Sequence, residues 1–193
     1  MKISRAMILA VLPMSLAAQQ PQGPPSGGPV TTVFRGRTMT LQRNLAQAFD
    51  SIPEAKFSFK PTPAQLSIGY IAQHLANDNY LFCNAFGDKK GTRAPEETST
   101  PDSVKATWPK AKLVEQLKAS LTFCEDAFAQ LDDTKLADNV SLQFGNNPPR
   151  QVPRAQMVLG HALDMADHYS QIANYMRLIN MLPPTALPRP PRP

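Results

Sequence analysis

The residues of this chain that are best suited to chemistry lie in one short stretch, HALDMADHYSQ, at residues 161–171. His161, Asp164 and His168 follow one another at intervals of three and four, so on a helix all three project from the same face. Apolar residues continue the same spacing on both sides. The pattern predicts ionisable side chains on a core-facing seam, where burial is costly unless they bind one another or a metal.

Histidine is scarce, with three in the whole chain, and the third lies in a second helical pattern at His74. Helical bundles usually complete a metal site with ligands from facing helices. His74, Asp164 and His168 therefore form a candidate metal site, with His161 and Tyr175 as additional ligands or neighbours. Two imidazoles and one carboxylate suit zinc, nickel, iron or manganese and leave a position for water or substrate. The alternative is a structural His–Asp hydrogen-bond network without a metal.

The two cysteines, Cys83 and Cys124, offer a second kind of chemistry. Both lie in apolar helical contexts, and the sequence has no Gly-x-Ser-x-Gly motif, so a nucleophilic site is disfavoured. In an oxidising compartment the two would be candidates for a disulfide. Cys124 is equally well explained as a small core residue, so the sequence leaves the bridge open.

Four predicted helices position these residues, at 38–52, at 63–84, after Pro109, and at 153–180. Pro53 ends the first helix, and Thr62 with Pro63 supplies a start signal for the second. A polar segment of about 20 residues separates the second helix from the third, which is too long for a tight hairpin. The sequence thus predicts an all-α four-helix bundle with a long crossover between its second and third helices, which run parallel.

Apolar seams are clearest in the third and fourth helices, where intervals of three and four alternate. In the third helix the seam runs through Val114, Leu117, Leu121, Cys124, Phe128 and Leu131. In the fourth it runs through Met157, His161, Asp164, His168, Gln171, Tyr175 and Leu178. In the second helix, Asp78 occupies a seam position and His74 lies beside it.

The ends of the chain are predicted to lie outside the folded domain. Residues 1–18 combine a basic start, a short apolar run and a small-residue end, which is typical of a bacterial secretory signal peptide. Residues 19–36 are rich in proline and glycine and predict a linker, and residues 186–193 predict a disordered Pro/Arg-rich tail. One domain, residues 37–185, remains, and we expect it to be periplasmic or secreted.

Most of the net positive charge of the chain comes from its two ends. The formal net charge of +5 includes Lys2, Arg5, Arg189 and Arg192, so the predicted domain is close to neutral. The sequence has no stripe of basic and aromatic residues, which argues against nucleic-acid binding. A small-molecule substrate and a homodimer are compatible with the sequence, and no membrane anchor is expected once the signal peptide is cleaved.

Three stretches give the domain a resemblance to the DinB superfamily, also called the DinB/YfiT-like metalloenzymes. They are FKPTPAQLSIGYIAQHLAND, LKASLTFCEDAF and DHYSQIANYMRLINMLPP, and the resemblance extends from Met39 to about Pro184. Each motif is loose, whereas their order and spacing are specific. The resemblance implies a four-helix bundle with a long second-to-third connection. It also implies a divalent metal held by one histidine of the second helix and two residues of the fourth.

Carried over onto this chain, the ligands of the family fall on His74, Asp164 and His168. The family commonly has histidine at the position of Asp164, so either the aspartate itself binds the metal or His161 compensates one turn earlier; we favour Asp164. Some members use low-molecular-weight thiols as transferases or isomerases, but export argues against this, because those thiols are cytosolic. The leading hypothesis is an exported metal-dependent hydrolase or transferase. The alternative is a non-catalytic binding or stress-related module.

Overall fold

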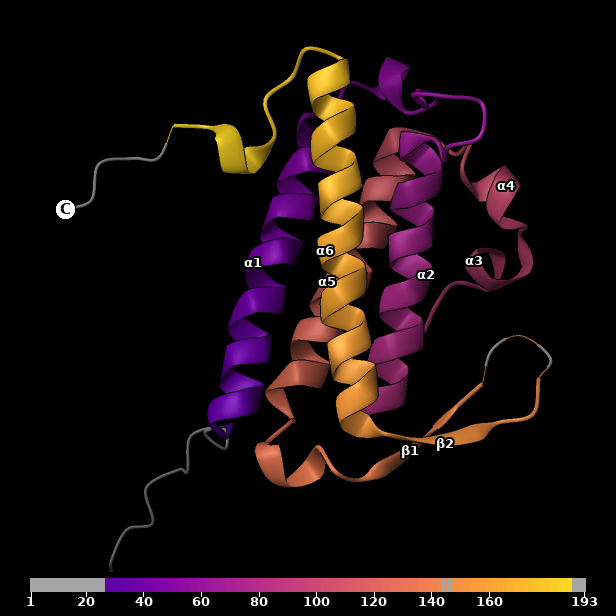
Figure 1. The fold of residues 1–193 in the computed structure, drawn as a ribbon. Coiled ribbons are helices and arrows are strands. Elements are labelled where there is room, and N and C mark those ends of the chain that lie inside the picture. The colour runs from indigo at the N-terminus through magenta and orange to yellow at the C-terminus, as the bar shows by residue number, and fades with distance from the viewer. Residues whose placement is uncertain (1–26, 144, 146, 189–193) are drawn as a thin grey trace, which may run out of the picture.

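The computed structural model describes residues 27–143, 145 and 147–188, and four long helices form its centre (Figure 1). They are α1 (Pro29–Ser51), α2 (Ile68–Phe86), α5 (Lys110–Ala129) and α6 (Arg154–Leu178). Each packs against two neighbours: α1 against α5 and α6, and α2 against α5 and α6. The predicted all-α four-helix bundle is confirmed.

Short elements connect the long helices. They are η1 (Glu54–Lys56), α3 (Pro95–Ser99), α4 (Asp102–Lys105), η2 (Asp133–Lys135), β1 (Asn139–Leu142), β2 (Arg150–Pro153) and η3 (Pro184–Ala186). The two strands form an antiparallel hairpin in which Val140 lies opposite Val152. The sequence pattern does not predict this hairpin, whose buried valines join the apolar cluster at the adjoining ends of α2, α5 and α6.

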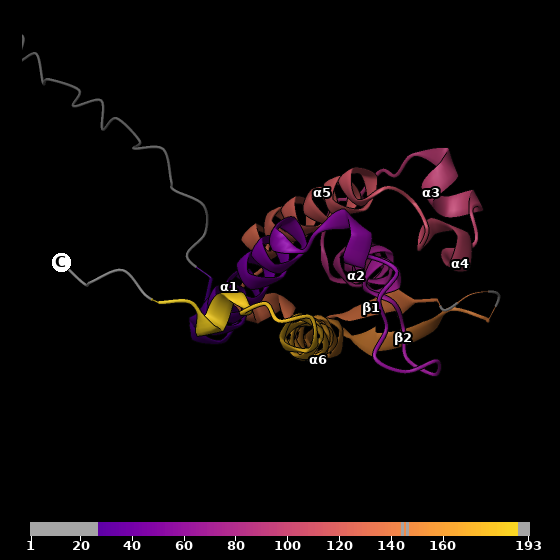
Figure 2. The ribbon, with the colours of Figure 1, turned by 90° about the horizontal axis from the view of Figure 1, so that it is seen from above.

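Helices α2 and α5 run parallel, as the predicted crossover requires. Asn79 of α2 donates a side-chain hydrogen bond to Ser120 of α5 at 2.8 Å, and one turn further along both helices Cys83 is bonded to Cys124. A constant offset between the two helices means that they point the same way. The connecting chain returns along the outside of α2 through α3 and α4, which lie apart from α1 in Figures 1 and 2.

A buried lysine fixes this crossover against α2. Lys105 is 4% exposed, and its ammonium group donates to Asn77 Oδ1 at 3.1 Å and to the carbonyl oxygen of Glu97 at 3.2 Å. It also pairs with Asp102 at 2.8 Å, and Asn77 donates to the same carboxylate at 3.1 Å. Burial of a charge is tolerated when it is paired and hydrogen-bonded. The network therefore holds Asp102 close to the outer face of α2.

The predicted seam of α5 is confirmed, because all of its positions from Val114 to Leu131 are buried. The predicted seam of α6 is wrong at its end. Leu178 is 60% exposed, whereas Met165 and Met176 are buried. A repeat of 3.5 residues drifts around a straight helix of 3.6 residues per turn, so the buried face has moved away from Leu178.

Helix α1 begins at Pro29, well before the predicted start at residue 38, so the predicted linker is wrong for residues 29–36. Proline suits the first position of a helix. The carboxylate of Asp133 caps this end, accepting hydrogen bonds from the backbone nitrogens of Val30 at 3.1 Å and Thr31 at 2.8 Å. The cap comes from η2, far along the chain, and no local pattern reveals it.

Helix α2 begins at Ile68, where Ser67 caps it by accepting a hydrogen bond from the backbone nitrogen of Tyr70 at 3.1 Å. The predicted start at Pro63, with Thr62 as its cap, is wrong. That segment forms a turn instead, in which the nitrogen of Gln65 donates to the carbonyl oxygen of Thr62 at 3.1 Å. Thr62 and Pro63 belong to this turn and do not start the helix, since the same residue types favour turns and helix starts.

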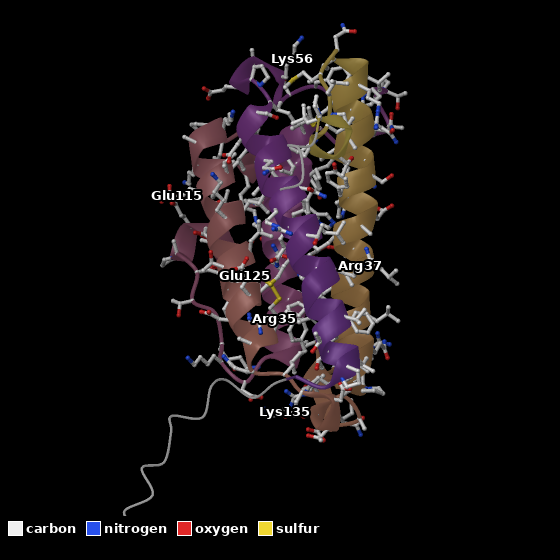
Figure 3. All side chains as sticks on the ribbon, turned by 90° about the vertical axis from the view of Figure 1, so that its left-hand side faces the viewer. Arg35, Arg37, Lys56, Glu115, Glu125 and Lys135 are labelled. Carbon is white, nitrogen blue, oxygen red and sulfur yellow. A yellow bond between two sulfur atoms is a disulfide. The ribbon has the colours of Figure 1, made fainter. Side chains whose placement is uncertain are left out.

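The ends of the chain are only partly described. The predicted signal peptide, residues 1–18, lies outside the described residues, as do residues 19–26 of the predicted linker and residues 189–193 of the predicted tail. Among the helices that the structure describes, none combines the length and the apolar character that crossing a membrane requires. Charged side chains such as Arg37 and Glu115 project outward from the bundle (Figure 3).

Candidate metal centre

A cluster of imidazole and carboxylate groups lies between α2 and α6. His74 and Asp78 of α2 and Asp164 and His168 of α6 each offer one ligand atom, and these atoms lie within 4.8 Å of one another. The two helices run antiparallel, so histidine faces histidine and aspartate faces aspartate. The ring centroids of His74 and His168 are 4.9 Å apart, and Asp78 meets Asp164 about one turn away.

Within each helix, the imidazole and the carboxylate are four residues apart and therefore project to the same side. His74 Nε2 lies 3.1 Å from Asp78 Oδ2, and His168 Nε2 lies 3.4 Å from Asp164 Oδ1. Both helices thus present an equivalent His–Asp pair to the space between them.

The ring of His168 is oriented by Gln171. The amide nitrogen of Gln171 donates to Asp167 at 2.9 Å, which turns its oxygen toward His168. His168 Nδ1 lies 3.2 Å from that oxygen. When Nδ1 carries the proton and donates it there, Nε2 presents its lone pair to the cluster. Hydrogen bonds of this kind orient metal-binding histidines.

The charges in the cluster disturb one another. Burial and the charge of Asp164 raise the pKa of Asp78 to about 7. Burial and His168 lower the pKa of His74. Burial alone would lower the pKa of His168, but the hydrogen bond and charge of Asp164 outweigh it and raise that pKa. Asp164 Oδ2 is buried and has no hydrogen-bond donor among the described residues, so this oxygen calls for a cation or a proton.

The donor set fits a divalent transition metal. Imidazole nitrogens and carboxylate oxygens are ligands of zinc, nickel, iron and manganese. The cluster supplies both kinds of atom at converging positions, together with the unpartnered oxygen of Asp164. The side chain of His74 is 32% exposed, so a bound cation would be accessible from solvent. The arrangement can hold a metal and present it to a small molecule.

The structure brings together the three predicted ligands, His74, Asp164 and His168. It adds Asp78, which the sequence indicated only as a seam position. A signal for Asp78 was present in the sequence, because its spacing from His74 repeats the spacing of Asp164 and His168 in the reverse order. On antiparallel helices, that reversal is what places the two aspartates together.

His161 lies outside this cluster. Its ring is fully buried among three phenylalanine rings, with centroids 5.7, 5.9 and 6.0 Å away. Its Nε2 lies 2.9 Å from the side-chain oxygen of Asn79, whose amide nitrogen donates to Ser120 at 2.8 Å. Burial lowers the pKa of His161 to about 4, so the ring is neutral near pH 7. The structure therefore places His161 in the core and not at the predicted additional ligand position.

Tyr175 also lies outside the cluster. Its ring is buried in the apolar core and packs edge-on against Phe59, with the ring centroids 6.1 Å apart. Tyr175 lies almost two turns beyond His168 on α6, and its predicted role beside the metal stays a prediction.

Cys83 and Cys124 form a disulfide, with their Cα atoms 5.4 Å apart. Both are fully buried, and the bond is visible inside the bundle in Figure 3. The bridge joins α2 to α5 beside His161. Of the two explanations that the sequence left open, both apply: Cys124 is a core residue and a member of a disulfide.

A cleft of about 680 Å³ lies at the start of α2, and none of the four cluster residues lines it. It is lined in part by Tyr70, whose ring centroid lies 6.2 Å from that of His74. Phe57 and Trp108 add apolar surface, and Lys60 adds a positive charge. Trp108 is the only tryptophan in the chain. The cleft can receive the apolar part of a small molecule, and Tyr70 is the lining residue that connects it to His74.

The fold and the cluster define the class of protein: a four-helix bundle with a crossover and a cluster of histidine and aspartate side chains between two of its helices. The family model of the DinB superfamily matches residues 38–172, and the chain belongs to this superfamily. The family resemblance seen in the sequence is thereby confirmed. Among proteins with curated descriptions, none matches the chain.

Several solved structures share the fold. A DinB-like protein from Bacillus cereus has a TM-score of 0.60 at 16% identity, covering 78% of this chain and 93% of that chain. A conserved protein from Enterococcus faecalis has a TM-score of 0.56 at 18% identity, covering 78% and 97%. A mycothiol-dependent maleylpyruvate isomerase has a TM-score of 0.58 at 12% identity, covering 74% of this chain and 60% of the isomerase. At these identities the similarity establishes the fold.

Proposed function

We propose that this chain is an exported protein that binds one divalent transition metal and acts as a hydrolase or transferase on a small molecule. His74, Asp164 and His168 hold the metal. The observation that carries the proposal is the convergence of these donors from two helices, together with the buried Asp164 Oδ2 that lacks a donor within the described residues. Membership of the DinB superfamily supports it, because members of this family bind divalent metals.

The residues of the chain prepare the site in three ways. When bound, a divalent metal acts as a Lewis acid and makes water a better nucleophile at neutral pH. Gln171 orients His168 through Nδ1. Burial and the nearby His168 lower the pKa of His74, which favours the neutral imidazole that a metal requires. The half-buried setting limits the access of bulk water, which strengthens electrostatic interactions with a bound substrate.

The cleft beside Tyr70 provides a place for the substrate. Its aromatic wall suits a planar apolar group, and Lys60 suits an anionic substituent. A small aromatic or unsaturated carboxylate combines these properties. Such a molecule, lying along Tyr70, would direct its far end toward His74.

Export is supported by two features of the chain. Residues 1–18 have the pattern of a secretory signal peptide. The buried disulfide between Cys83 and Cys124 is of a kind that persists in oxidising compartments. An exported chain does not meet cytosolic thiols, so we do not extend the mycothiol dependence of the isomerase to it.

The proposal is tested by elemental analysis of the chain purified without a histidine tag, followed by calorimetric titration of the chelator-stripped protein. One metal per chain is expected, and His74→Ala or His168→Ala should abolish binding. His161→Gln is the matched control, because it removes the third histidine and leaves the cluster intact. A wild-type chain that holds no metal, and whose melting temperature ignores added manganese, nickel or zinc, would support the alternative of a structural polar network in a binding module.

A further inference from the structure

We infer that Asp78 is a fourth ligand of the metal, so that the site contains two histidines and two carboxylates. The inference rests on the proposed metal binding and goes beyond the three ligands that the family implies. It has a chemical consequence: four protein ligands close the site around zinc but leave it open around manganese or iron.

The geometry treats the two aspartates alike. Asp78 belongs to the same group of ligand atoms within 4.8 Å as Asp164. Their side chains are 19% and 18% exposed, and each lies against the histidine of its own helix, at 3.1 Å and 3.4 Å. The two His–Asp pairs face each other in reversed order across the antiparallel helices. A cation placed among His74, Asp164 and His168 is therefore also placed beside Asp78.

The balance of charge favours the same conclusion. A divalent cation with neutral imidazoles and only Asp164 leaves a net positive charge, while the carboxylate of Asp78 stays unused beside it. Burial of unbalanced charge is costly, and a cation between two carboxylates turns their repulsion into attraction. The next acid, Asp102, is already compensated by Lys105 at 2.8 Å. Two aspartates and one divalent cation make the site neutral.

The fourth ligand determines which metal leaves room for a substrate. Zinc sites with four protein ligands are tetrahedral and closed, whereas catalytic zinc keeps three protein ligands and one open position. Manganese and iron accept six ligands, and carboxylate oxygens suit manganese well. With Asp78 bound, two positions remain open on an octahedral metal. The working metal is therefore manganese or iron, and zinc forms a stable but closed site.

The first test compares Asp78→Asn with Asp126→Asn, which changes an exposed aspartate of α5. Calorimetric titration with manganese should show a loss of affinity of more than about 100-fold for Asp78→Asn, because the loss of even an outer partner of a metal site costs about 10–100-fold. Asp126→Asn should bind as the wild type does. Without metal, Asp78→Asn should melt no lower than the wild type, since its repulsion with Asp164 is gone. Asp78→Glu, which keeps the carboxylate, should restore part of the affinity.

The second test measures the open position directly. Cobalt replaces zinc and reports its geometry through visible absorption, which is intense for tetrahedral sites. The cobalt spectrum of the wild type should be intense and unchanged by azide, whereas the spectrum of Asp78→Asn should shift when azide enters the vacated position. Equal manganese affinities for the wild type and Asp78→Asn, with azide-sensitive cobalt spectra in both, would overturn the role of Asp78 and leave the three-ligand site intact. A wild type that binds no metal would overturn the proposed function itself.

Discussion

Helix α6 carries two histidines, two turns apart, in opposite surroundings. His168 lies in an open cluster, which comprises His74, Asp78, Asp164 and His168 and is partly exposed and rich in charge. His161 lies in a closed cluster with Asn79, Ser120 and the disulfide, where the ring is fully buried and neutral. The same residue type on the same helix therefore has two roles, and the facing residues of α2 decide between them.

The residues of α2 that face His161 and those that face His168 differ in whether they leave a charge without a partner. In the closed cluster, Asn79 accepts from His161 and donates to Ser120, and the one polar atom left without a partner among the described residues is the uncharged His161 Nδ1. In the open cluster, two carboxylates face each other, and Asp164 Oδ2 has no donor in the part of the chain that the structure describes. A closed polar network stabilises the core, whereas surplus carboxylate attracts a cation.

The largest expected effect concerns the closed cluster. Replacing Cys83 and Cys124 together with alanine should lower the free energy of unfolding by about 4 kcal/mol, because the bridge links residues 41 positions apart. Urea unfolding followed by circular dichroism measures this loss. Manganese affinity should stay unchanged, since the two clusters share no ligand. A folded double variant that no longer binds metal would show that the clusters are coupled.

The second largest expected effect is the loss of stability that acid causes through the closed cluster. The pKa of His161 is about 4 in the folded chain, below its ordinary value of 6.5. Between these values His161 takes up a proton in the unfolded chain but not in the folded chain. The stability that the neutral ring contributes is therefore fully present above about pH 6.5 and is lost as the pH falls toward 4. The full shift corresponds to about 3 kcal/mol. His161→Gln should therefore lose less stability on acidification than the wild type does.

The metal-free open cluster responds to pH in the opposite sense. The pKa of Asp78 is raised to about 7 from 3.8, so the folded chain holds an extra proton between these values and loses stability as the pH rises through them. For this reason His161→Gln and the wild type are compared pairwise at each pH, without metal, by urea unfolding. Parallel stability curves would mean that His161 does not titrate as its burial requires.

Metal should stabilise the open cluster by a smaller amount. Manganese at about 100 times its dissociation constant raises the free energy of unfolding by about 2.7 kcal/mol, which differential scanning calorimetry measures. His168→Ala should lose this gain and Asp164→Ala most of it. Asp164→His, which recreates the commoner ligand of the superfamily, should keep it. If manganese raises the free energy of unfolding of Asp164→Ala as much as that of the wild type, the carboxylate is not a ligand.

The smallest effect concerns the cleft that Tyr70 and Trp108 line. Replacing Lys60 there should leave the free energy of unfolding unchanged. Benzoate should change the fluorescence of Trp108, the only tryptophan in the chain and part of the cleft wall. Lys60→Gln should weaken this binding about 2–5-fold, as expected for an exposed charge. If benzoate leaves the fluorescence of Trp108 in the wild type unchanged, the cleft is not the substrate site.

The sequence by itself determined the bundle and most of the open cluster. Hydrophobic periodicity is a local property, so the seam of α5 could be read from Val114 to Leu131 without knowledge of its partners. The long polar segment before Pro109 indicated the parallel arrangement of α2 and α5, since a hairpin needs only a few residues. Helical spacing placed Asp164 and His168 on one side of α6, and the scarcity of histidine pointed to His74.

Only the tertiary structure decided which side chains meet across helices. Spacing shows which face of a helix turns inward, but not how far a facing helix is shifted or rotated about its axis. That shift sets His161 against Asn79 and His168 against His74, and it brings Asp78 to Asp164. The cap that Asp133 provides for α1 was hidden for the same reason. These contacts join residues far apart in the chain, and no local pattern records them.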